Sequence, residues 1–215
     1  PGSEGIFDWL TSAKTSDTTI LEKIRDDTGD PTKMVEASYL RPYQMHGSIG
    51  TSAAIAQLGE DGVMTIHTHS QNVFGLAGAV AELLGMDPAK VHCIHTQGSG
   101  CYGHNMADDA GADAALLAAA VLGKPVKLQY TRAQEHQWEP YGSAMVVKTR
   151  AGIDANGDIL DWSLDVWSTS HGTRPGGKAG NLLSGKYVEP PFEQPVPKDG
   201  GPPNYSAARN AIALY

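Results

Sequence analysis

A glycine-rich segment between an expected strand and an expected helix is the clearest place for chemistry in this sequence. Residues 98–103 read Gly-Ser-Gly-Cys-Tyr-Gly and fit the pattern G-x-G-x-x-G. Small residues at such a turn let backbone N–H groups approach an anion or a polar cofactor. The candidate cofactor-binding residues of this turn are Gly98, Ser99, Gly100, Cys101, Tyr102 and Gly103. An ordinary strand-to-helix turn is the alternative interpretation of the same residues.

The same pattern is the fingerprint of dinucleotide binding, but its surroundings differ here. In that fingerprint an acidic residue follows about 20 positions later, at the end of the next strand. Gly123-Lys124-Pro125 stands there instead, and the first acidic residue after the next strand is Glu135. The preceding strand also carries His92 and His95, whereas a central parallel strand is usually apolar. A nicotinamide-dinucleotide site is therefore the less favoured alternative.

Gln71 is the second candidate, in the sequence Ser70-Gln71-Asn72, where a strand is expected to turn into a helix. If Ser70 were the N-cap, Gln71 would lie in the first helical turn and its carboxamide would be a fixed, neutral donor. Such a donor suits an oxo ligand or a developing oxyanion. We therefore take Gln71 as a candidate catalytic and cofactor-binding residue.

The histidines and cysteines do not have the spacing of a metal centre. His67 and His69 share one face of an expected strand, but two ligands do not complete a site. Cys93 and Cys101 lie eight residues apart, without zinc-ribbon spacing. A helix N-terminus at Cys101 would activate its thiol as a nucleophile; the alternative is a small loop residue.

Hydrophobic periodicity predicts an α+β (mixed α/β) fold, with hairpins, in which two main helices pack on mixed twisted sheets. Gly59–Gly62 and Asn156-Gly157 predict hairpin turns, the second one of two residues. Gly85 predicts a helix end. The expected strands cover residues 35–40, 53–58, 63–68, 90–97, 126–131, 144–151 and 159–168, and the expected main helices cover 73–84 and 107–122.

Length and composition exclude several classes of protein. The chain of 215 residues is long enough for one sizeable core or two small ones. Its net charge of −8 disfavours a nucleic-acid-binding role, which needs a basic surface. No stretch reaches the roughly 18 consecutive apolar residues of a membrane span, and two cysteines exclude a disulfide-rich scaffold. The compartment stays open, with the cytoplasm favoured over the periplasm.

The pattern along the chain suggests three parts. We expect residues 1–33 to be an inter-domain linker with a short helix near 16–24, and residues 34–170 to be a domain core. Residues 171–215 are expected to form a Gly/Pro-rich irregular excursion followed by a return strand. The chain begins without Met and ends on an apolar run, so we expect a fragment of a longer polypeptide.

In order, these segments resemble the first molybdopterin-binding domain of the molybdenum hydroxylases, the xanthine dehydrogenase/aldehyde oxidase family. The resemblance is closer to the bacterial branch that includes the large subunits of nicotinate and isoquinoline dehydrogenases. The matching series is Ser70-Gln71, Leu83-Leu84-Gly85, Lys90-Val91, the glycine-rich turn, the Ala-rich helix, Gly123-Lys124-Pro125-Val126-Lys127, Thr131-Arg132 and Glu135.

The resemblance implies a molybdopterin cofactor, in bacterial relatives usually the cytosine dinucleotide form, with no protein ligand to the metal. It implies hydroxylation of a C–H carbon of an aldehyde or N-heterocycle, with water as the oxygen source. The implied partners are a second molybdopterin-binding domain of the same chain and an iron–sulfur redox subunit, with FAD or a cytochrome as further possibilities.

The resemblance also assigns roles to single residues. Gln71 matches the glutamine whose amide binds a molybdenum oxo ligand, and the turn keeps two of the family's glycines, Gly98 and Gly100. Cys101 stands where the family has Phe, and residues 46–50 replace its Met-Glu-Pro segment. The family's general base, a Glu, would lie beyond Tyr215. The isolated chain is therefore expected to be inactive and without bound cofactor, and a non-catalytic scaffold is the alternative.

Overall fold

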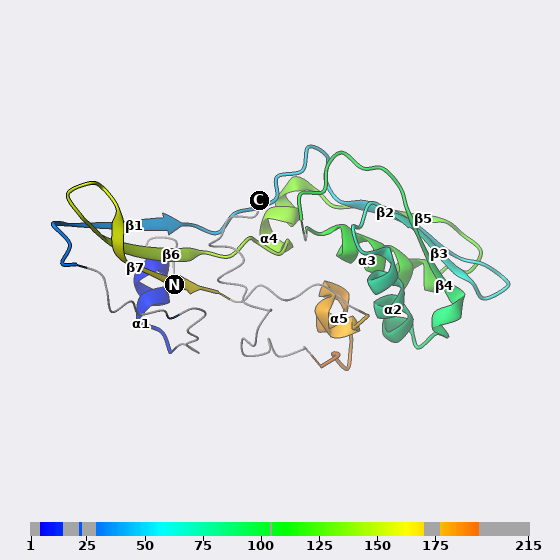
Figure 1. Cartoon of the computed structure of the whole chain (residues 1–215). Coiled ribbons are helices and arrows are strands. Elements are labelled where there is room, and N and C mark those ends of the chain that lie inside the picture. Colours follow the sequence, from blue (N-terminus) through cyan, green and yellow to red (C-terminus); the bar gives the residue numbers. More distant parts are fainter. Residues whose placement is uncertain (1–4, 15–21, 23–28, 104, 170–176, 194–215) are drawn as a thin grey trace. The chain divides into compact units, whose positions relative to one another are not determined.

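The computed structural model describes residues 5–14, 22, 29–103, 105–169 and 177–193, and all structural statements concern these residues. They form two compact units. Unit 1 takes its described residues from 1–44 and 142–172, and unit 2 takes them from 45–141 and 173–196. Helices and mixed strands occur in the α+β arrangement that the sequence predicts (Figure 1).

Unit 1 is built on a three-stranded antiparallel sheet. Its strands are β1 (Lys33–Arg41), β6 (Met145–Ile153) and β7 (Ile159–Ser168), in the order β1-β6-β7. Helix α1 (Ile6–Ser12) packs on one face of the sheet. The small core of this unit consists of Ile6, Leu10, Ala144 and Val146, with Phe7 and Trp167 at its border.

The β6–β7 hairpin has one residue more than predicted. Asp154 donates its N–H to the Asp158 carbonyl at 3.0 Å, and Gly157 donates to the Asp154 carbonyl at 3.2 Å. The connection is therefore Ala155-Asn156-Gly157, with Gly157 in the left-handed region at φ 92°. Three-residue connections with a glycine in the left-handed region are a common alternative to a two-residue Asn-Gly turn.

Unit 2 contains a four-stranded sheet with the order β4-β3-β2-β5. Its strands are β2 (Ala53–Leu58), β3 (Met64–Thr68), β4 (Val91–His95) and β5 (Val126–Gln129), and a 3₁₀ turn, η1 (Pro88–Lys90), precedes β4. Strands β3 and β4 are parallel, while β2 runs antiparallel to both of its neighbours.

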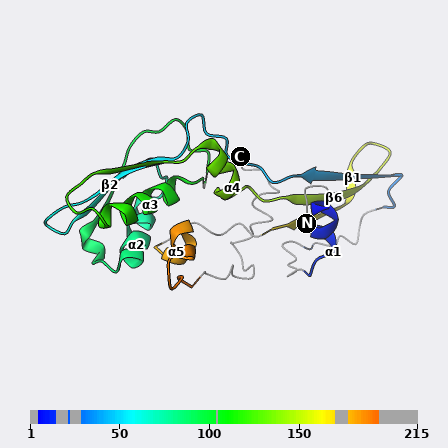
Figure 2. The ribbon, with the colours of Figure 1, turned by 180° about the vertical axis from the view of Figure 1, so that it is seen from behind.

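Two helices cover one face of this sheet and bury the main core. They are α2 (Val73–Leu84) and α3 (Ala107–Ala119), and both lie on the same side of the strands in the front and back views (Figures 1 and 2). Gly85 ends α2 at φ 62°, as predicted, whereas α3 ends three residues earlier than predicted. Gly111 lets α3 approach α2, because a Cβ there would lie 2.8 Å from Leu76 Cδ2.

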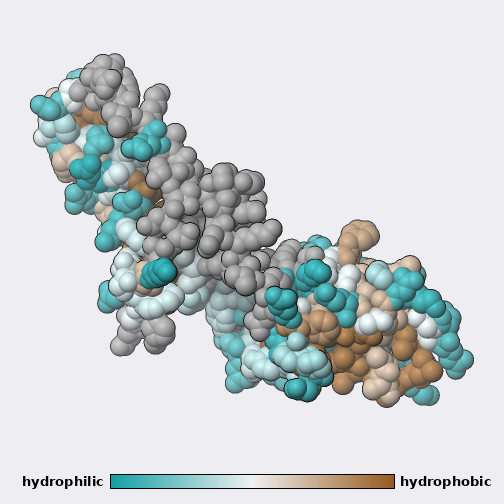
Figure 3. Space-filling view, turned by 90° about the horizontal axis from the view of Figure 1, so that it is seen from below, coloured by the Kyte–Doolittle hydropathy of each residue, from teal (hydrophilic) through white to brown (hydrophobic). Residues whose placement is uncertain are grey.

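The described part of the Gly/Pro-rich region is not wholly irregular. It forms η2 (Ala179–Asn181) and the short helix α5 (Leu183–Tyr187), on the helical side of unit 2, where apolar surface gathers (Figure 3). Ala179 and Leu182 are fully buried in the core with α2 and α3. The predicted helix near 16–24 and the return strand toward Tyr215 lie outside the described residues.

In the described part of the chain, no helix has the length and apolar character needed to cross a membrane.

Candidate functional site

The two sequence-predicted segments meet at one edge of the unit 2 sheet. Parallel strands β3 and β4 end at Thr68 and His95, and Gln71 and Gly98 each follow three residues later. The carboxyl ends of neighbouring parallel strands are where α/β sheets usually bind ligands. Here the Gln71 carboxamide donates from Nε2 to the Cys101 carbonyl at 2.7 Å. The structure therefore brings Gln71 and the glycine turn into direct contact.

Gln71 is held by anchors different from those expected. The N-cap of α2 is Asn72, whose Oδ1 accepts the Gly75 N–H at 3.2 Å, so Ser70 is not the cap. The fully buried Ser70 instead donates its hydroxyl to Asp108 of α3 and accepts the Asn72 N–H at 3.0 Å. Gln71 thus precedes the helix, between two residues whose positions are fixed.

Contacts or backbone angles require glycine at three positions of the turn. A Cβ on Gly98 would lie 2.8 Å from Cβ and Cγ of His69, which packs against it. Gly100 and Gly103 have φ values of 112° and 135°, which L-residues rarely adopt. A Cβ on Gly103 would also lie 2.8 Å from His46 Nε2. The turn can therefore adopt this backbone conformation only with glycine at these three positions.

The turn does not open a helix, contrary to two of the alternatives considered. Helix α3 begins at Ala107, four residues after Gly103. The dinucleotide fingerprint requires its glycines at the helix start, and a thiol is activated by a helix only at its N-terminus. Cys101 is therefore not activated in that way, and the nicotinamide interpretation loses its structural basis.

Asn105 connects the glycine turn to a third segment, residues 45–52. Its side chain is buried, donates to Ser48 Oγ at 3.3 Å and accepts the Ala107 N–H at 3.0 Å. The Cys101 thiol lies 3.8 Å from Asn105 Oδ1. The Ile49 N–H donates to the Ser99 carbonyl at 3.1 Å. Residues 45–52, the start of α2 and the glycine turn therefore form one site.

A short helix that the sequence analysis missed, α4 (Arg132–Trp138), holds residues 48–52 in place. Glu135 is 1% exposed, accepts the Ser52 N–H at 2.6 Å and pairs with Arg132 at 2.8 Å. Arg132 also donates to the Ser48 carbonyl. Thr131 and Gln134 form a capping box, and this T-x-x-Q spacing is the signal that could have predicted the helix.

A second carboxylate of the α4 region fixes the start of the same segment. Buried Glu139, at the C-terminal end of α4, accepts the His46 N–H at 2.7 Å, and His46 Nδ1 lies 3.6 Å from the same oxygen. Glu135 and Glu139 are four residues apart, so both face residues 45–52 from one side of the helix.

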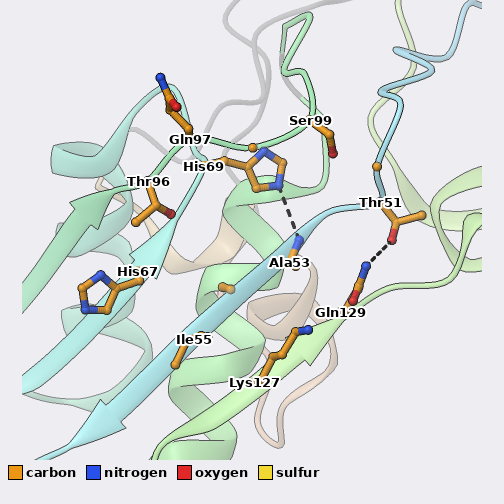
Figure 4. A pocket seen from close by; sticks show the side chains of 13 residues that line it. Thr51, Ala53, Ile55, His67, His69, Thr96, Gln97, Ser99, Lys127 and Gln129 are labelled. Atoms are coloured by element: carbon orange, nitrogen blue, oxygen red, sulfur yellow. Dashed lines mark hydrogen bonds between the residues drawn. The ribbon is translucent and has the colours of Figure 1, made fainter.

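A pocket of about 540 Å³ opens beside the turn, on the sheet side that Ile55, His67 and Lys127 share (Figure 4). Among the described residues, its lining contains the cation Lys127 and no carboxylate. His69 accepts the Ala53 N–H through Nε2 at 3.4 Å, while its buried Nδ1 has no hydrogen-bond partner in the described structure. Burial lowers the pKa of His69, so the imidazole is neutral near pH 7.

The lining of the pocket includes residues from the segment 45–52 and from the glycine turn. It consists of Gly50, Thr51, Ala53, Ala54, Ile55, His67, His69, Thr96, Gln97, Gly98, Ser99, Lys127 and Gln129. Two of the predicted cofactor-binding residues, Gly98 and Ser99, are among these, whereas Gln71 and residues 100–103 lie outside the lining.

The described residues hold no cluster of three or more His, Cys, Asp or Glu that could bind a metal ion. His67 and His69 both line the pocket, in agreement with the prediction that they share a face. Burial raises the pKa of the Cys93 thiol to about 12, which makes it unreactive near neutral pH.

Comparisons with known proteins identify the family of this chain. The model of the molybdopterin cofactor-binding domain family matches residues 22–180. The chain belongs to this family. It is 38% identical over 156 residues to a nicotinate dehydrogenase subunit of Pseudomonas putida, a match covering 72% of this chain and 13% of that protein. It is 26% identical to the aldehyde oxidoreductase of Megalodesulfovibrio gigas, over 86% of this chain and 19% of that protein.

A solved structure shows the same fold. The aldehyde oxidoreductase from Desulfovibrio gigas matches with a TM-score of 0.57 and 25% identity, over 63% of this chain and 15% of that one. The resemblance to the molybdenum hydroxylases is thereby confirmed. This molybdopterin-binding domain spans less than a fifth of the length of these relatives.

The stability of this domain should depend on pH through Asp109 of α3. The carboxyl is buried and accepts the Leu183 N–H at 2.7 Å. Burial raises its pKa from 3.8 to about 7; the Leu183 hydrogen bond and Lys186 oppose this rise, while Asp113 and Asp108 add to it. Between about pH 4 and 7 the folded state keeps a proton that the unfolded state has lost, so stability falls as pH rises through this window.

We expect Asp109→Asn to remove that pH dependence, because the amide keeps an acceptor for Leu183 without a titrating proton. Urea unfolding at pH 5 and pH 8 measures it: between these pH values the unfolding free energy of the parent should fall by about 2.5 kcal/mol more than that of the variant. Glu60→Gln, at an exposed position, is the control. Parallel pH profiles of parent and Asp109→Asn would contradict the assignment.

The packing of His69 on Gly98 predicts a second effect in this molybdopterin-binding domain. Gly98→Ala should destabilise it by about 2 kcal/mol, because the new methyl group overlaps the buried imidazole. The same substitution in a His69→Gly background should cost much less, since neither the Cβ nor the ring of residue 69 remains to clash. Thermal or urea unfolding of the four proteins of this cycle is the measurement, and equal costs in both backgrounds would exclude the clash as the cause.

Proposed function

We propose that this chain supplies the first part of the molybdopterin site in the large subunit of a molybdenum-dependent hydroxylase. The substrate would be an aldehyde or an N-heterocycle, oxidised at a C–H carbon with water as the oxygen source. The observation that supports this most is the hydrogen bond between the Gln71 carboxamide and Cys101 in the glycine turn. It places a polar side chain and a glycine-built backbone turn together beside a pocket.

The chemistry of the residues fits such a cofactor. Molybdopterin carries its own dithiolene ligands and a phosphate, so it needs hydrogen-bond donors from the protein rather than metal-binding side chains. The described pocket offers Lys127, the turn at Gly98 and Ser99, and an unpaired buried nitrogen on His69, with no carboxylate to repel an anion. Residues 98–103 would hold the cofactor, and Gln71 would bind beside the metal.

The bound cofactor supplies the redox chemistry, in which two electrons leave the substrate carbon and an oxygen derived from water is added. The residues of this chain bind and orient. Gln71 presents a neutral donor, which favours an oxyanion without titrating. Asn105, Glu135 and Glu139 keep residues 45–52 against the turn, so the backbone donors are fixed before any ligand arrives.

The remaining parts of the proposed enzyme would lie outside these 215 residues. We propose that a second molybdopterin-binding domain of the same large subunit completes the site and contributes the general base, a Glu. An iron–sulfur subunit, with FAD or a cytochrome as a further carrier, would accept the electrons. The cofactor would be the cytosine dinucleotide form. The isolated chain, with residues 34–170 as its core domain, would then neither hold the cofactor tightly nor turn over.

A non-catalytic scaffold is the second candidate, and two substitutions favour it. Cys101 stands at the family's Phe position, and residues 46–50 replace the Met-Glu-Pro segment. In the structure both places nevertheless make specific contacts. The Cys101 carbonyl accepts a hydrogen bond from Gln71, and Glu139 accepts one from the His46 N–H. A scaffold that kept the fold could retain both contacts, so the molybdenum content of the complete large subunit decides between the two candidates.

The deciding experiment measures molybdenum in the complete large subunit, produced with its partners and with cofactor maturation. We expect about one molybdenum per subunit for the parent, and clear loss for Gly103→Ala, which strains the turn at φ 135° and meets His46. Gly157→Ala is the matched control, because φ is 92° and no other atom lies near its Cβ position. Folded parent protein without molybdenum would refute the proposal.

A further inference from the structure

The middle of one face of the unit 1 sheet carries only uncharged side chains, with Lys33 and Arg41 at the two ends of β1 beyond it. Residues paired directly across neighbouring strands point to the same side of a sheet, and three consecutive rows of such pairs share this face. From β1 through β6 to β7 the rows are Tyr39-Val147-Val166, Ala37-Thr149-Leu164 and Val35-Ala151-Trp162. We call these nine residues the apolar face.

On the opposite side of the sheet, charged residues lie in the middle of the strands. Glu36 is paired with Arg150, and Lys148 with Asp165, while Arg150 also forms an ion pair with Asp161 at 2.9 Å. Helix α1 covers one end of this charged side, where its Ile6 and Leu10 pack with Val146 of β6 (Figure 1). The sheet is therefore two-sided, with its single described helix on the charged side.

Large side chains of the apolar face are exposed. Tyr39 is 62% exposed, Trp162 57%, Val35 44% and Leu164 40%. Soluble proteins seldom leave a contiguous apolar surface of this kind in water, and such surfaces mark contact sites. This exposure is typical of a sheet face that packs against another element.

The dimensions of the face favour one occupant. Three strands about 4.8 Å apart and five residues of about 3.3 Å each give a patch of roughly 14 by 17 Å. A stable dimer buries about 800 Å² on each partner, which exceeds what this patch offers to a second copy. One α-helix, about 10 Å wide with its side chains, matches the width of three strands. The uncharged central rows require that helix to present an apolar stripe, and Lys33 and Arg41 lie at the ends of β1 beyond these rows.

We propose that one amphipathic helix from further polypeptide of the same large subunit packs on the apolar face. This rests on the proposed function, in that the chain is one part of a longer subunit; the matched region is only 13% of the nicotinate dehydrogenase relative. A segment of the same polypeptide is present at high effective concentration, so a small contact area is sufficient for stable docking. Unit 1 then has a helix on each side of its sheet.

Cysteine labelling at two neighbouring positions of β7 tests the proposal. Leu164 lies on the apolar face and Asp165 on the charged face, and both are exposed. Leu164→Cys and Asp165→Cys are labelled with a maleimide, in the chain alone and in the complete large subunit, and read by peptide mass spectrometry to separate Cys93 and Cys101. In the subunit we expect labelling at 164 to slow at least about tenfold, with 165 almost unchanged.

A second pair of variants covers the case that Leu164→Cys fails to fold. Tyr39→Cys on the apolar face and Ser38→Cys on the other side should show the same contrast. Equal labelling of 164 in chain and subunit, or equal slowing at both positions, overturns the proposal. A dimer of the isolated chain in sedimentation that Leu164→Lys dissociates would also overturn it, in favour of a second copy.

The molybdenum content of the same preparations separates this inference from the proposed function. If the complete large subunit contains molybdenum but Cys at position 164 is labelled as fast as in the chain alone, only the docked helix is refuted. Protection of 164 in a subunit without molybdenum supports the helix and contradicts the hydroxylase.

Discussion

Glu135→Ala should destabilise unit 2 by about 3 kcal/mol, the cost of breaking a buried ion pair from one side. The substitution leaves the Ser52 N–H without its acceptor and removes the partner of the Arg132 guanidinium. The Arg132 side chain is 36% exposed and can regain some hydration, so the value lies at the low end for buried pairs. Urea unfolding of the whole chain measures the loss.

An exposed Arg–carboxylate pair provides the control for Glu135→Ala. Arg150 and Asp161 are 2.9 Å apart, close to the 2.8 Å between Arg132 and Glu135, but both of their side chains are 49% exposed. Asp161→Ala should therefore cost no more than about 1 kcal/mol. Glu135→Gln, which keeps one acceptor for Ser52, should fall between the two. If Glu135→Ala and Asp161→Ala cost the same, the buried network does not hold residues 48–52.

The sequence predicted the elements whose causes are local. The β2–β3 hairpin follows from Gly59–Gly62, and the end of α2 follows from Gly85 in the left-handed region. Strand alternation and helical periodicity act over a few residues, so they are visible without any tertiary information. The family resemblance likewise rested on the order of these local segments, and the family match confirmed it.

The anchors of the site were missed because their partners are distant in the sequence. Ser52 and Glu135 are 83 residues apart, and His46 and Glu139 are 93 apart. Ser70 was assigned as a cap by local spacing, whereas its hydroxyl bonds Asp108 across the core. A carboxylate on a helix is usually solvated, so nothing local marked Glu135 as buried. Helix α4 was missed as well, although its capping box is a local signal that the sequence does contain.

Gln71→Ala should affect turnover far more than stability. Its carboxamide is exposed and donates to the Cys101 carbonyl, and loss of an exposed neutral hydrogen bond should cost no more than about 1 kcal/mol of folding free energy. Loss of a preorganised donor at a reacting centre typically lowers kcat by about 100-fold or more. We expect such a decrease in the complete, molybdenum-loaded enzyme, with unchanged metal content.

Two further variants make the result for Gln71 specific. Gln57 of β2 also donates its carboxamide to a backbone carbonyl, that of Gly123 at 3.1 Å, and it is likewise exposed. Gln57→Ala should therefore leave kcat unchanged, which controls for the loss of a carboxamide as such. Gln71→Glu keeps the shape and removes both N–H donors, so it should lose turnover like Gln71→Ala. If Gln71→Glu retains full activity, or if Gln71→Ala does, donation from this side chain is not part of the reaction.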